Sequence, residues 1–358
     1  MSKFYPLTVA QVKHETRDAI AVTFAVPAEL KDSFKYQQGQ HLTLRAMIGG
    51  EDVRRSYSIC SAVQDDLLRV AIKRTPGGQF STWANESLRP GATLDVMPPM
   101  GHFNVPLDPA SSRHYLVFAS GSGITPILSI IKTTLIAEPH SRFTLFYGNR
   151  ASSTVLFRDE LTDLKDTYLE RLKLVYVMSR EQQDIELFNG RITQDKCELF
   201  LRHWVRIEDI DVAFICGPED MMHGVSAALQ AAGMPKERIR IELFAASIPK
   251  HEHKPRQFEV GAKHLTEVTV ILDGTAATFT MDKDKESILD AGLRAGIDMR
   301  YSCKGGVCST CRCKLVEGNV DMDVNYALED YEVARGFVLS CQAFPVTDKV
   351  VVDFDQAE

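Results

Sequence analysis

Residues 303–311 read Cys303-Lys304-Gly305-Gly306-Val307-Cys308-Ser309-Thr310-Cys311, and Cys341 follows in a separate segment. The spacing C-x4-C-x2-C with one distant fourth cysteine is the plant-type ligand pattern of a 2Fe–2S cluster. One loop must wrap such a cluster, and Gly305 and Gly306 allow the close backbone approach that wrapping needs. A structural zinc site, the main alternative, usually pairs two short cysteine knuckles. The four cysteines are therefore predicted metal ligands in a protein that moves single electrons.

The composition is that of a soluble globular protein with two or three domains. The chain has 358 residues, of which 44% are hydrophobic and 25% charged, and this length is large for one domain. It contains neither a signal-peptide core near its start nor an apolar run of membrane-helix length. Because four of the eight cysteines serve best as thiolate ligands, a reducing cytosol is indicated. We expect a cytoplasmic protein without a membrane partner, in which Cys60, Cys197 and Cys313 have no essential role.

The charge is unevenly distributed along the chain. Residues 263–358 hold ten Lys and Arg against seventeen Asp and Glu, whereas residues 1–262 are balanced. A surface of one sign can steer the docking of a basic partner, and a merely solvated acidic face is the equal alternative. The same count disfavours nucleic-acid binding.

Two kinds of pattern follow one another in the first two thirds of the chain. Residues 1–107 contain short strand-like runs divided by Gly- and Pro-rich turns, which favours a small antiparallel β-barrel. Residues 112–245 alternate buried strand-like runs with amphipathic helices, which favours a parallel sheet covered by helices. The runs in the first region are 41–45, 56–60 and 67–73, and those in the second are 115–119, 143–147, 172–178 and 212–216.

The remaining residues form a linker and a third module. Residues 246–262 are polar and carry two prolines without any periodicity, as linkers do. Within residues 263–358, Asp273-Gly274 separates two strand-like runs and is a strong hairpin signal. With a helix expected over 286–295 and a closing strand at 350–352, this region predicts a β-grasp module around the cysteine loop. The fold class is therefore multidomain: a β-barrel, an α/β parallel-sheet domain and an α+β ferredoxin domain.

Motifs in the first module are suited to a flavin. In Arg55-Ser56-Tyr57-Ser58 an arginine and a tyrosine on one strand face can hold a pyrophosphate and stack on a flat ring. Gly78-Gln79-Phe80-Ser81 then opens a helix, whose N-terminus favours a phosphate. Either motif alone is weak, since Arg–Tyr strand pairs are usually surface features. In this order, with Gly39-Gln40-His41-Leu42 and Gly101-His102-Phe103, they resemble the flavin signature of the ferredoxin–NADP reductase family.

The second module carries a nucleotide motif, Gly121-Ser122-Gly123-Ile124-Thr125-Pro126, between a strand and a helix. Its glycines let the backbone approach a pyrophosphate at the helix N-terminus, and a bare glycine turn is the alternative. Pro126 stands where the dinucleotide fingerprint has its third glycine. In this G-x-G-x-x-P form the chain resembles the reductase family. The run Cys216-Gly217-Pro218 is similar to the family's Cys-Gly-Pro beside the nicotinamide.

The choice of nicotinamide nucleotide depends on the strand ends of this module. An NAD site usually offers an acid to the ribose 2′-hydroxyl at the end of the second strand. That strand here ends in Tyr147-Gly148-Asn149-Arg150, and the next one ends in Met178-Ser179-Arg180. Because Arg150 and Arg180 can meet a 2′-phosphate, we expect NADPH, with NADH possible and ordinary surface arginines as the alternative.

The whole chain resembles the three-module oxygenase reductases of this family and, more narrowly, the reductases of bacterial phenylacetyl-CoA epoxidases of phenylacetate catabolism. The resemblance implies FAD, NADPH and a di-iron oxygenase as the electron acceptor. It also implies that Ser58 bonds to the flavin edge, that Cys216 shapes the hydride path and that Glu242 closes the site. A ring-hydroxylating dioxygenase, another di-iron monooxygenase or a hybrid-cluster protein remains an alternative acceptor.

Overall fold

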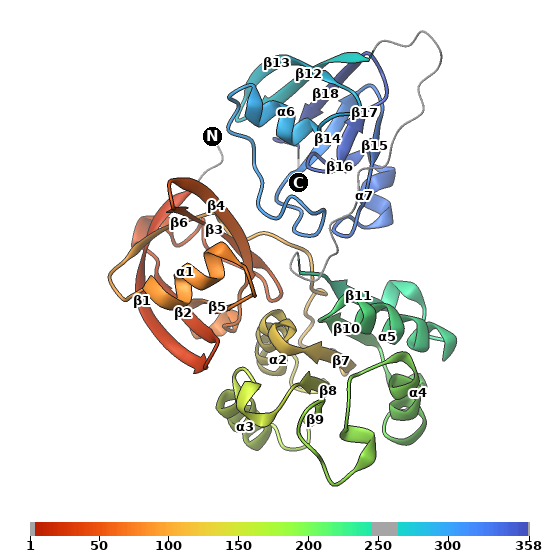
Figure 1. The fold of residues 1–358 in the computed structure, drawn as a ribbon. Helices are drawn as coiled ribbons and strands as arrows, with labels where there is room; N and C mark the ends of the chain where they lie inside the picture. The colour runs from red at the N-terminus through yellow and green to blue at the C-terminus, as the bar shows by residue number, and fades with distance from the viewer. Residues whose placement is uncertain (1–3, 245–263, 357–358) are drawn as a thin grey trace. The chain divides into compact units, whose positions relative to one another are not determined.

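The computed structural model describes residues 4–244 and 264–356, which form two compact units (Figure 1). The first unit holds Tyr5–Val53 and the residues from Tyr57 to the end of the first described range. The second holds the described residues from 264 onward, together with Phe4 and Arg54–Ser56. The predicted linker over 246–262 lies outside the described residues. The barrel and the parallel sheet belong to the same unit and are called here the flavin half and the nucleotide half. Among the described residues, no helix is both long and apolar enough to cross a membrane.

The flavin half is a six-stranded antiparallel sheet in the order β4-β3-β6-β1-β2-β5, with helix α1 beside it. The bridge between Ile59 and Val70 joins the chain leaving β4 to β5, so the two edges of the sheet meet and a barrel results. The strand expected at 56–60 starts earlier, at Glu51, because Gly49 and Gly50 adopt positive φ and turn the chain directly from β3 into β4. The elements are β1 Tyr5–Thr16, β2 Ala19–Ala25, β3 His41–Ile48, β4 Glu51–Ser58, β5 Leu68–Lys73, α1 Gln79–Ser87 and β6 Thr93–Val96.

The nucleotide half is a five-stranded parallel sheet in the order β11-β10-β7-β8-β9. Successive residues of its strands enter different cores: Tyr115 and Val117 pack with α2 and α3, whereas Leu116 and Phe118 pack with α4 and α5. Both faces of the sheet are thus covered, as the continuous apolar strands predict. The elements are β7 His114–Ser120, α2 Ile124–Ala137, β8 Arg142–Asn149, α3 Arg158–Thr167, β9 Leu172–Met178, α4 Gln194–His203, β10 Val212–Cys216, α5 Glu219–Ala231 and β11 Ile239–Glu242.

The strand order changes direction at β7, which has β8 on one side and β10 on the other. At such a switch point the loops leaving adjacent strands diverge, and ligands bind in the crevice beyond the carboxyl ends. The chain leaving β7 is the Gly121 turn, and the chain leaving β10 is Gly217-Pro218. The fold therefore places both predicted nucleotide motifs at one edge.

The second unit has the strand order β13-β12-β18-β14-β16, with β12 and β18 parallel and helix α6 beside the sheet. The predicted hairpin is confirmed: Leu272 pairs with Thr275, and Asp273 and Gly274 both have positive φ. The helix expected over 286–295 begins at Ile288, because the Ser287 hydroxyl accepts the Asp290 N–H as an N-cap. The elements are β12 Leu265–Leu272, β13 Thr275–Asp282, α6 Ile288–Arg294, β14 Arg312–Glu317, β15 Val320–Met322, α7 Asp330–Ala334, β16 Phe337–Leu339, β17 Ala343–Pro345 and β18 Lys349–Asp353.

The predicted fold class, with an antiparallel barrel, a parallel α/β sheet and an α+β ferredoxin module, is thus confirmed. The predicted boundary at 107–112 falls in the segment between β6 and β7 and stays a prediction, because both halves belong to one compact unit. Strand β9 has the predicted bounds, as does β10, while the short strand β11 and helix α4 were not expected from the sequence.

Candidate active site

The end of β4 presents the predicted flavin residues in alternation. Arg55 is exposed, Tyr57 is half-buried and Ser58 is buried. The Tyr57 ring lies against Phe80 of α1, with ring centroids 5.7 Å apart. Strand and helix therefore fix the ring that is expected to pack on the cofactor.

The start of α1 is shaped for a close ligand. Gly78 is the N-cap residue, and a Cβ atom on it would lie 2.6 Å from Ser81 Oγ. Ser81 Oγ also accepts the Thr75 N–H at 3.1 Å, which ties the preceding loop to the first helical turn. Because the first turn of a helix leaves its N–H groups without helical partners, Gly78 and Ser81 form a narrow cradle that fits a phosphate.

His41 lies at the other edge of the predicted flavin site. A Cβ atom on Gly101 would lie only 2.9 Å from His41 Nδ1, so the two predicted runs pack directly together. Burial, followed by the nearby His102, lowers the pKa of His41 to about 4, so the imidazole is neutral at pH 7. Its Nε2 is buried without a hydrogen-bond partner among the described residues. An orphaned ring nitrogen beside these motifs is what a site completed by a bound cofactor would contain.

The nucleotide turn is tied to the sheet on two sides. The Tyr147 hydroxyl donates to the Gly121 carbonyl at 2.9 Å, and Thr125 Oγ1 donates to the Ser122 carbonyl at 3.0 Å. A Cβ atom on Gly123 would lie 2.1 Å from the Cys216 carbonyl oxygen, so the turn rests on the end of β10. The N-terminus of α2, with Pro126 in its first turn, faces the same edge.

Gly217 and Pro218 complete that edge. A Cβ atom on Gly217 would lie 2.6 Å from Met221 Cε and 3.0 Å from Ser120 Cβ, so a larger residue would have to displace the end of the Met221 side chain. Pro218 is the N-cap of α5. The two glycine-containing turns therefore leave backbone, and not side chains, facing the crevice, which fits a nucleotide.

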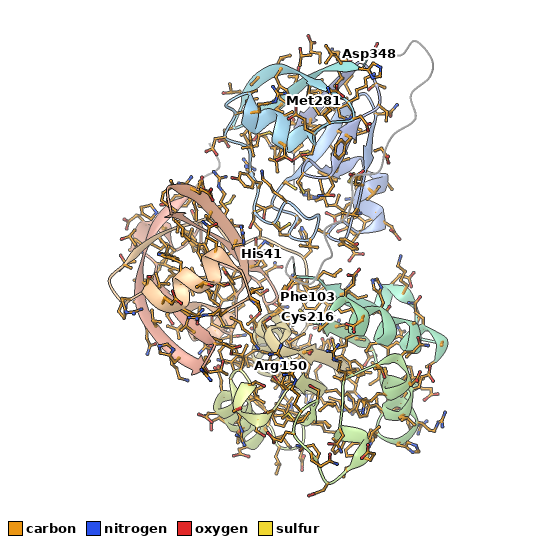
Figure 2. The ribbon with its side chains drawn as sticks, in the orientation of Figure 1. His41, Phe103, Arg150, Cys216, Met281 and Asp348 are labelled. Carbon is orange, nitrogen blue, oxygen red and sulfur yellow. The ribbon has the colours of Figure 1, made fainter. Side chains whose placement is uncertain are left out.

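Ser58, Cys216 and Glu242 are brought together, although they are far apart in the sequence. The Ser58 hydroxyl donates to Glu242 Oε2 at 3.2 Å, and Glu242 is paired with Cys216 in the register of β10 and β11. Figure 2 labels Cys216 at the end of its strand. Burial raises the pKa of Glu242 to about 8, although the Ser58 hydrogen bond opposes that rise.

Cys216 is fully buried, and burial together with the Glu242 carboxyl raises the pKa of its thiol. A neutral thiol is a poor nucleophile. At pH 7 the group thus holds a protonated carboxyl, a hydroxyl and a neutral thiol at the switch point, which suits proton handling.

Arg150 and Arg180 both lie exposed at strand ends, and the Arg180 N–H donates to the Arg150 carbonyl at 2.8 Å. Arg180 lines a pocket of about 310 Å³ together with Ser179, Glu181 and Asn189. Sequence reasoning missed Glu181, which follows Arg180 directly. Its carboxylate accepts hydrogen bonds from Ser152, at 2.8 Å from the N–H and 2.5 Å from the hydroxyl. Those bonds lower its pKa and hold the acid on the Ser152 loop.

Three of the four predicted metal ligands lie in the loop 303–311 of the second unit, and the fourth, Cys341, lies between β16 and β17. The Cys303 thiol interacts most strongly with Cys308, and the Cys311 thiol interacts most strongly with Cys341. Two irons with two thiolates each require such a pairing. Among the described residues, these cysteines included, no three His, Cys, Asp or Glu side chains converge on one point to hold a single metal ion.

The backbone of this loop donates to the sulfurs. The Gly305 N–H lies 3.3 Å from Cys303 Sγ, and the Cys303 N–H lies 3.5 Å from Cys308 Sγ. Lys304 and Ser309 take positive φ values, which turns the loop inward. Cys313 is different: it is fully buried on β14, and its thiol is 3.8 Å from the Val338 carbonyl. Donors aimed at sulfur fit an iron–sulfur cluster, whose potential such bonds tune.

Three family models match successive parts of the chain. An oxidoreductase FAD-binding domain matches residues 6–105, an oxidoreductase NAD-binding domain matches 117–227, and a 2Fe–2S iron–sulfur cluster binding domain matches 270–346.

Two relatives match over almost the whole length of the chain. A component of the 1,2-phenylacetyl-CoA epoxidase of Escherichia coli is 47% identical over 99% of this chain and 99% of its own. The ferredoxin reductase component of 3-ketosteroid-9-alpha-monooxygenase from Rhodococcus rhodochrous is 36% identical over 97% of this chain and 96% of its own.

Solved structures share the fold. Phthalate dioxygenase reductase superposes with a TM-score of 0.57 at 23% identity and covers 98% of both chains. An intact type IV self-sufficient cytochrome P450 monooxygenase gives a TM-score of 0.69 at 22% identity, and the present chain spans 41% of that longer one. The matched domains, their order and the whole-length relatives agree with the cofactor sites described above. The chain therefore belongs to the NAD(P)H-dependent, FAD- and 2Fe–2S-containing reductase components of oxygenases.

Proposed function

We propose that this reductase supplies electrons to a phenylacetyl-CoA epoxidase in phenylacetate catabolism. The observation that carries the proposal is the 47% identity with the epoxidase component over 99% of both chains, which includes the ferredoxin module that meets the acceptor. The 36% identity with a 3-ketosteroid monooxygenase component favours a second candidate, a monooxygenase of that kind.

The three cofactors are needed because a nicotinamide gives up two electrons at once, whereas a 2Fe–2S cluster accepts only one. A bound FAD converts the two electrons of a hydride into the single steps that a 2Fe–2S cluster accepts. Ser58 is proposed to bond to the flavin edge, with the protonated Glu242 carboxyl as the source of a proton that the Ser58 hydroxyl relays. Cys216 is proposed to shape the space in which the nicotinamide lies.

NADPH is the proposed electron donor. Its support is Arg180, which lines the 310 Å³ pocket and can pair with a 2′-phosphate. The Glu181 carboxylate of the same pocket opposes such an anion, but it is engaged by hydrogen bonds from Ser152. The Arg180→Ala variant should lose kcat/KM for NADPH roughly tenfold or more, because a charge-assisted bond to the 2′-phosphate is removed. The value for NADH should hardly change. Equal kcat/KM values for the two nucleotides in the wild type would contradict the proposal.

The compartment is proposed to be the cytoplasm. The four ligand thiols and the unpaired buried cysteines Cys60, Cys197 and Cys313 suit a reducing environment.

The acceptor is tested with purified components. The reductase is mixed anaerobically with NADPH and either the phenylacetyl-CoA epoxidase oxygenase component or the 3-ketosteroid monooxygenase oxygenase component, and reduction of each acceptor is followed by its spectrum. After oxygen is admitted, substrate oxidation is measured. Faster coupled turnover with the epoxidase component is expected, and preferred reduction of the steroid oxygenase would overturn the assignment.

A further inference from the structure

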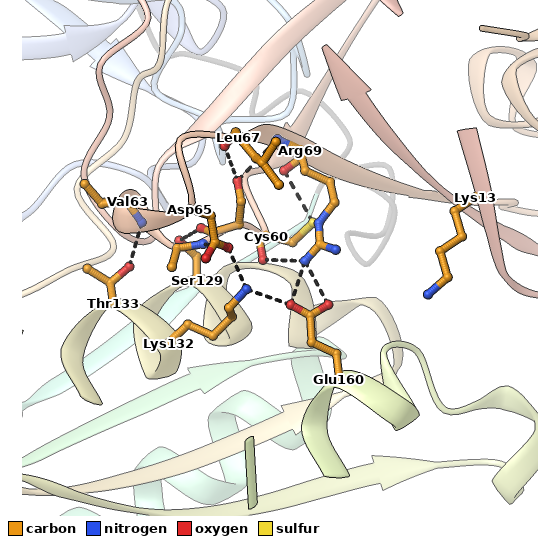
Figure 3. A network of polar contacts seen from close by, with 12 residues as sticks. Lys13, Cys60, Val63, Asp65, Leu67, Arg69, Ser129, Lys132, Thr133 and Glu160 are labelled. Carbon is orange, nitrogen blue, oxygen red and sulfur yellow. Dashed lines mark hydrogen bonds and ion pairs between the residues drawn. The ribbon is translucent and has the colours of Figure 1, made fainter. Parts of the chain in front are cut away.

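Four charged side chains join the flavin half to the nucleotide half (Figure 3). Arg69 of β5 donates to both carboxylate oxygens of Glu160 on α3, at 2.9 and 2.8 Å. Lys132 of α2 donates to Glu160 at 2.8 Å and to Asp65 at 2.6 Å. Asp65 also accepts the Ala62 N–H at 2.9 Å. The alternating charges form one continuous chain across the boundary, called here the bridging network.

The network is partly shielded from water. The side chains of Lys132 and Arg69 are 14% and 16% exposed, and those of Glu160 and Asp65 are 24% and 25% exposed. Burial opposes the ionisation of Glu160, yet the hydrogen bonds from Arg69 and Lys132 keep its pKa below the ordinary value. Removal of one partner would leave a poorly solvated charge without its counter-ion, and such changes are more costly than the loss of a surface pair.

Uncharged contacts on the same face of α2 reinforce the network. Ser129 Oγ donates to the Ser61 carbonyl at 2.7 Å, and the Val63 N–H donates to Thr133 Oγ1 at 3.1 Å. Ser129, Lys132 and Thr133 are spaced i, i+3 and i+4, so they line one side of the helix. The segment 61–65 therefore lies along this side of α2, as Figure 3 shows.

The ends of these two elements carry the predicted chemistry. The segment 61–65 begins three residues after Ser58, and α2 begins directly after the turn Gly121–Gly123. Any rotation between the halves that displaced the segment along α2 would alter the separation between Ser58 and that turn. Hydride transfer needs reacting atoms about 3–3.5 Å apart, and a 1 Å error can cost about a hundredfold in rate.

We propose that the bridging network, with Ser129 and Thr133, is a positioning device that holds the flavin half and the nucleotide half in register for hydride transfer. The inference rests on the family's transfer of a hydride from NAD(P)H to FAD. Its residues are not among the predicted cofactor-binding or catalytic residues, so their proposed action is through the orientation of the two halves. Electron transfer from flavin to cluster does not depend on that register.

The main test is the Glu160→Gln variant, which keeps the shape of the side chain and removes its charge. In anaerobic stopped flow with saturating NADPH, the limiting rate of flavin reduction should fall roughly ten- to a hundredfold. The deuterium isotope effect with 4-deuterated NADPH should rise, and the Kd for NADPH should change less than threefold. Cluster reduction after photoreduction of the flavin should keep its wild-type rate.

A second readout does not depend on activity. Hydrogen exchange at the Ala62 and Val63 amides should accelerate in Glu160→Gln, because the segment loosens from α2. The matched control is Glu86→Gln, which removes an ion pair to Arg74 at 3.3 Å inside the flavin half. It should leave flavin reduction and both amides unchanged.

Two further variants keep the proposal falsifiable should Glu160→Gln lose its FAD. Lys132→Arg retains the charge and should retain most of the rate, whereas Thr133→Val removes one bond and should slow hydride transfer two- to fivefold. An unchanged hydride rate and isotope effect in Glu160→Gln or Thr133→Val, with only a lower Tm, would reduce the network to a stabilising contact. A wild-type protein whose flavin is reduced by neither NADPH nor NADH would instead refute the function on which the inference rests.

Discussion

At the scale of single residues, the cysteine assignment is open to a direct test. Cys341→Ser should remove the cluster, because one iron loses a thiolate that pairs with Cys311. Flavin reduction by NADPH should survive, since the thiols belong to the second unit. Iron content and the visible spectrum measure the first effect, and stopped flow measures the second.

The matched control is Cys313→Ser, because Cys313 is buried nearby but its thiol faces the Val338 carbonyl. This variant should keep two irons per chain. Should it lose iron as Cys341→Ser does, the ligand set proposed here is wrong.

Glu242 is the residue whose protonation should govern the pH dependence. Its pKa in the folded protein is about 8, above the ordinary value of 4.5, because burial disfavours the charged form. The proton-holding form is therefore lost as the pH rises through 8. In a pH–rate profile, turnover of the wild type should therefore decrease above about pH 8. The Glu242→Gln variant should lack this alkaline limb and turn over roughly a hundredfold more slowly. A limb near pH 8 that persists in the variant would assign the titration to another group.

The same pKa shift has a consequence for stability. An acid whose folded pKa is raised favours the folded state fully below its unfolded pKa, and this contribution is lost as the pH rises towards the folded pKa. The free energy of unfolding of the wild type should therefore decrease between about pH 4.5 and 8 because of this group. Glu242→Gln, which does not titrate, should show a smaller loss across that interval in denaturant titrations.

At the scale of elements, the Gly121 turn depends on close contact with β10. Gly123 has a negative φ, so its need for glycine comes from the 2.1 Å approach of a Cβ to the Cys216 carbonyl and not from backbone strain. Gly123→Ala should push the turn away from the strand and weaken NADPH binding tenfold or more, as measured by titration of the oxidised protein. Gly233→Ala is the control: its φ is +96° with open space around it, so only about 1 kcal/mol of strain is expected.

The elements also show what a sequence can and cannot predict. Strand β10 was predicted with its bounds because a parallel strand buried on both faces is a continuous apolar run. Strand β9 lies at the edge of the sheet and is only partly buried, but its run is still apolar apart from Lys173. The Asp273-Gly274 hairpin was predicted because its turn chemistry is local. Strand β11 was missed, since its four residues include Arg240 and Glu242 and resemble a surface loop.

Of the contacts between residues distant in the sequence, one was anticipated and the others were not. Ser58 and Glu242 lie 184 residues apart and were brought into one site by resemblance, because no local pattern links them. The bridging network was not predicted at all. Arg69, Lys132 and Glu160 read as ordinary surface charges along the sequence, and only the packing of α2 and α3 beside β5 brings them together.

At the scale of the whole molecule, the acidic excess of residues 263–358 concerns the acceptor. Most basic side chains of this unit form ion pairs with carboxylates of the same unit. The charges that remain unpaired are therefore mainly carboxylates, and the net surface charge is negative. The paired basic residues are Lys283, Lys285, Arg294, Arg300, Lys304, Arg312 and Lys349. A negative surface on the electron-carrying module favours an acceptor with a basic docking face.

If that attraction steers docking, electron transfer to the oxygenase should slow as the salt concentration rises. Exposed charges are screened over about 8–10 Å at 0.1–0.15 M ionic strength, and steered association is the step most affected. Transfer from flavin to cluster occurs within one chain and needs no encounter, so it should respond far less and serves as the internal control. Stopped-flow traces of cluster reduction and acceptor reduction follow both steps in one experiment. Acceptor reduction that is indifferent to salt would show that the acidic excess is only a solvated face, with docking determined by uncharged contacts.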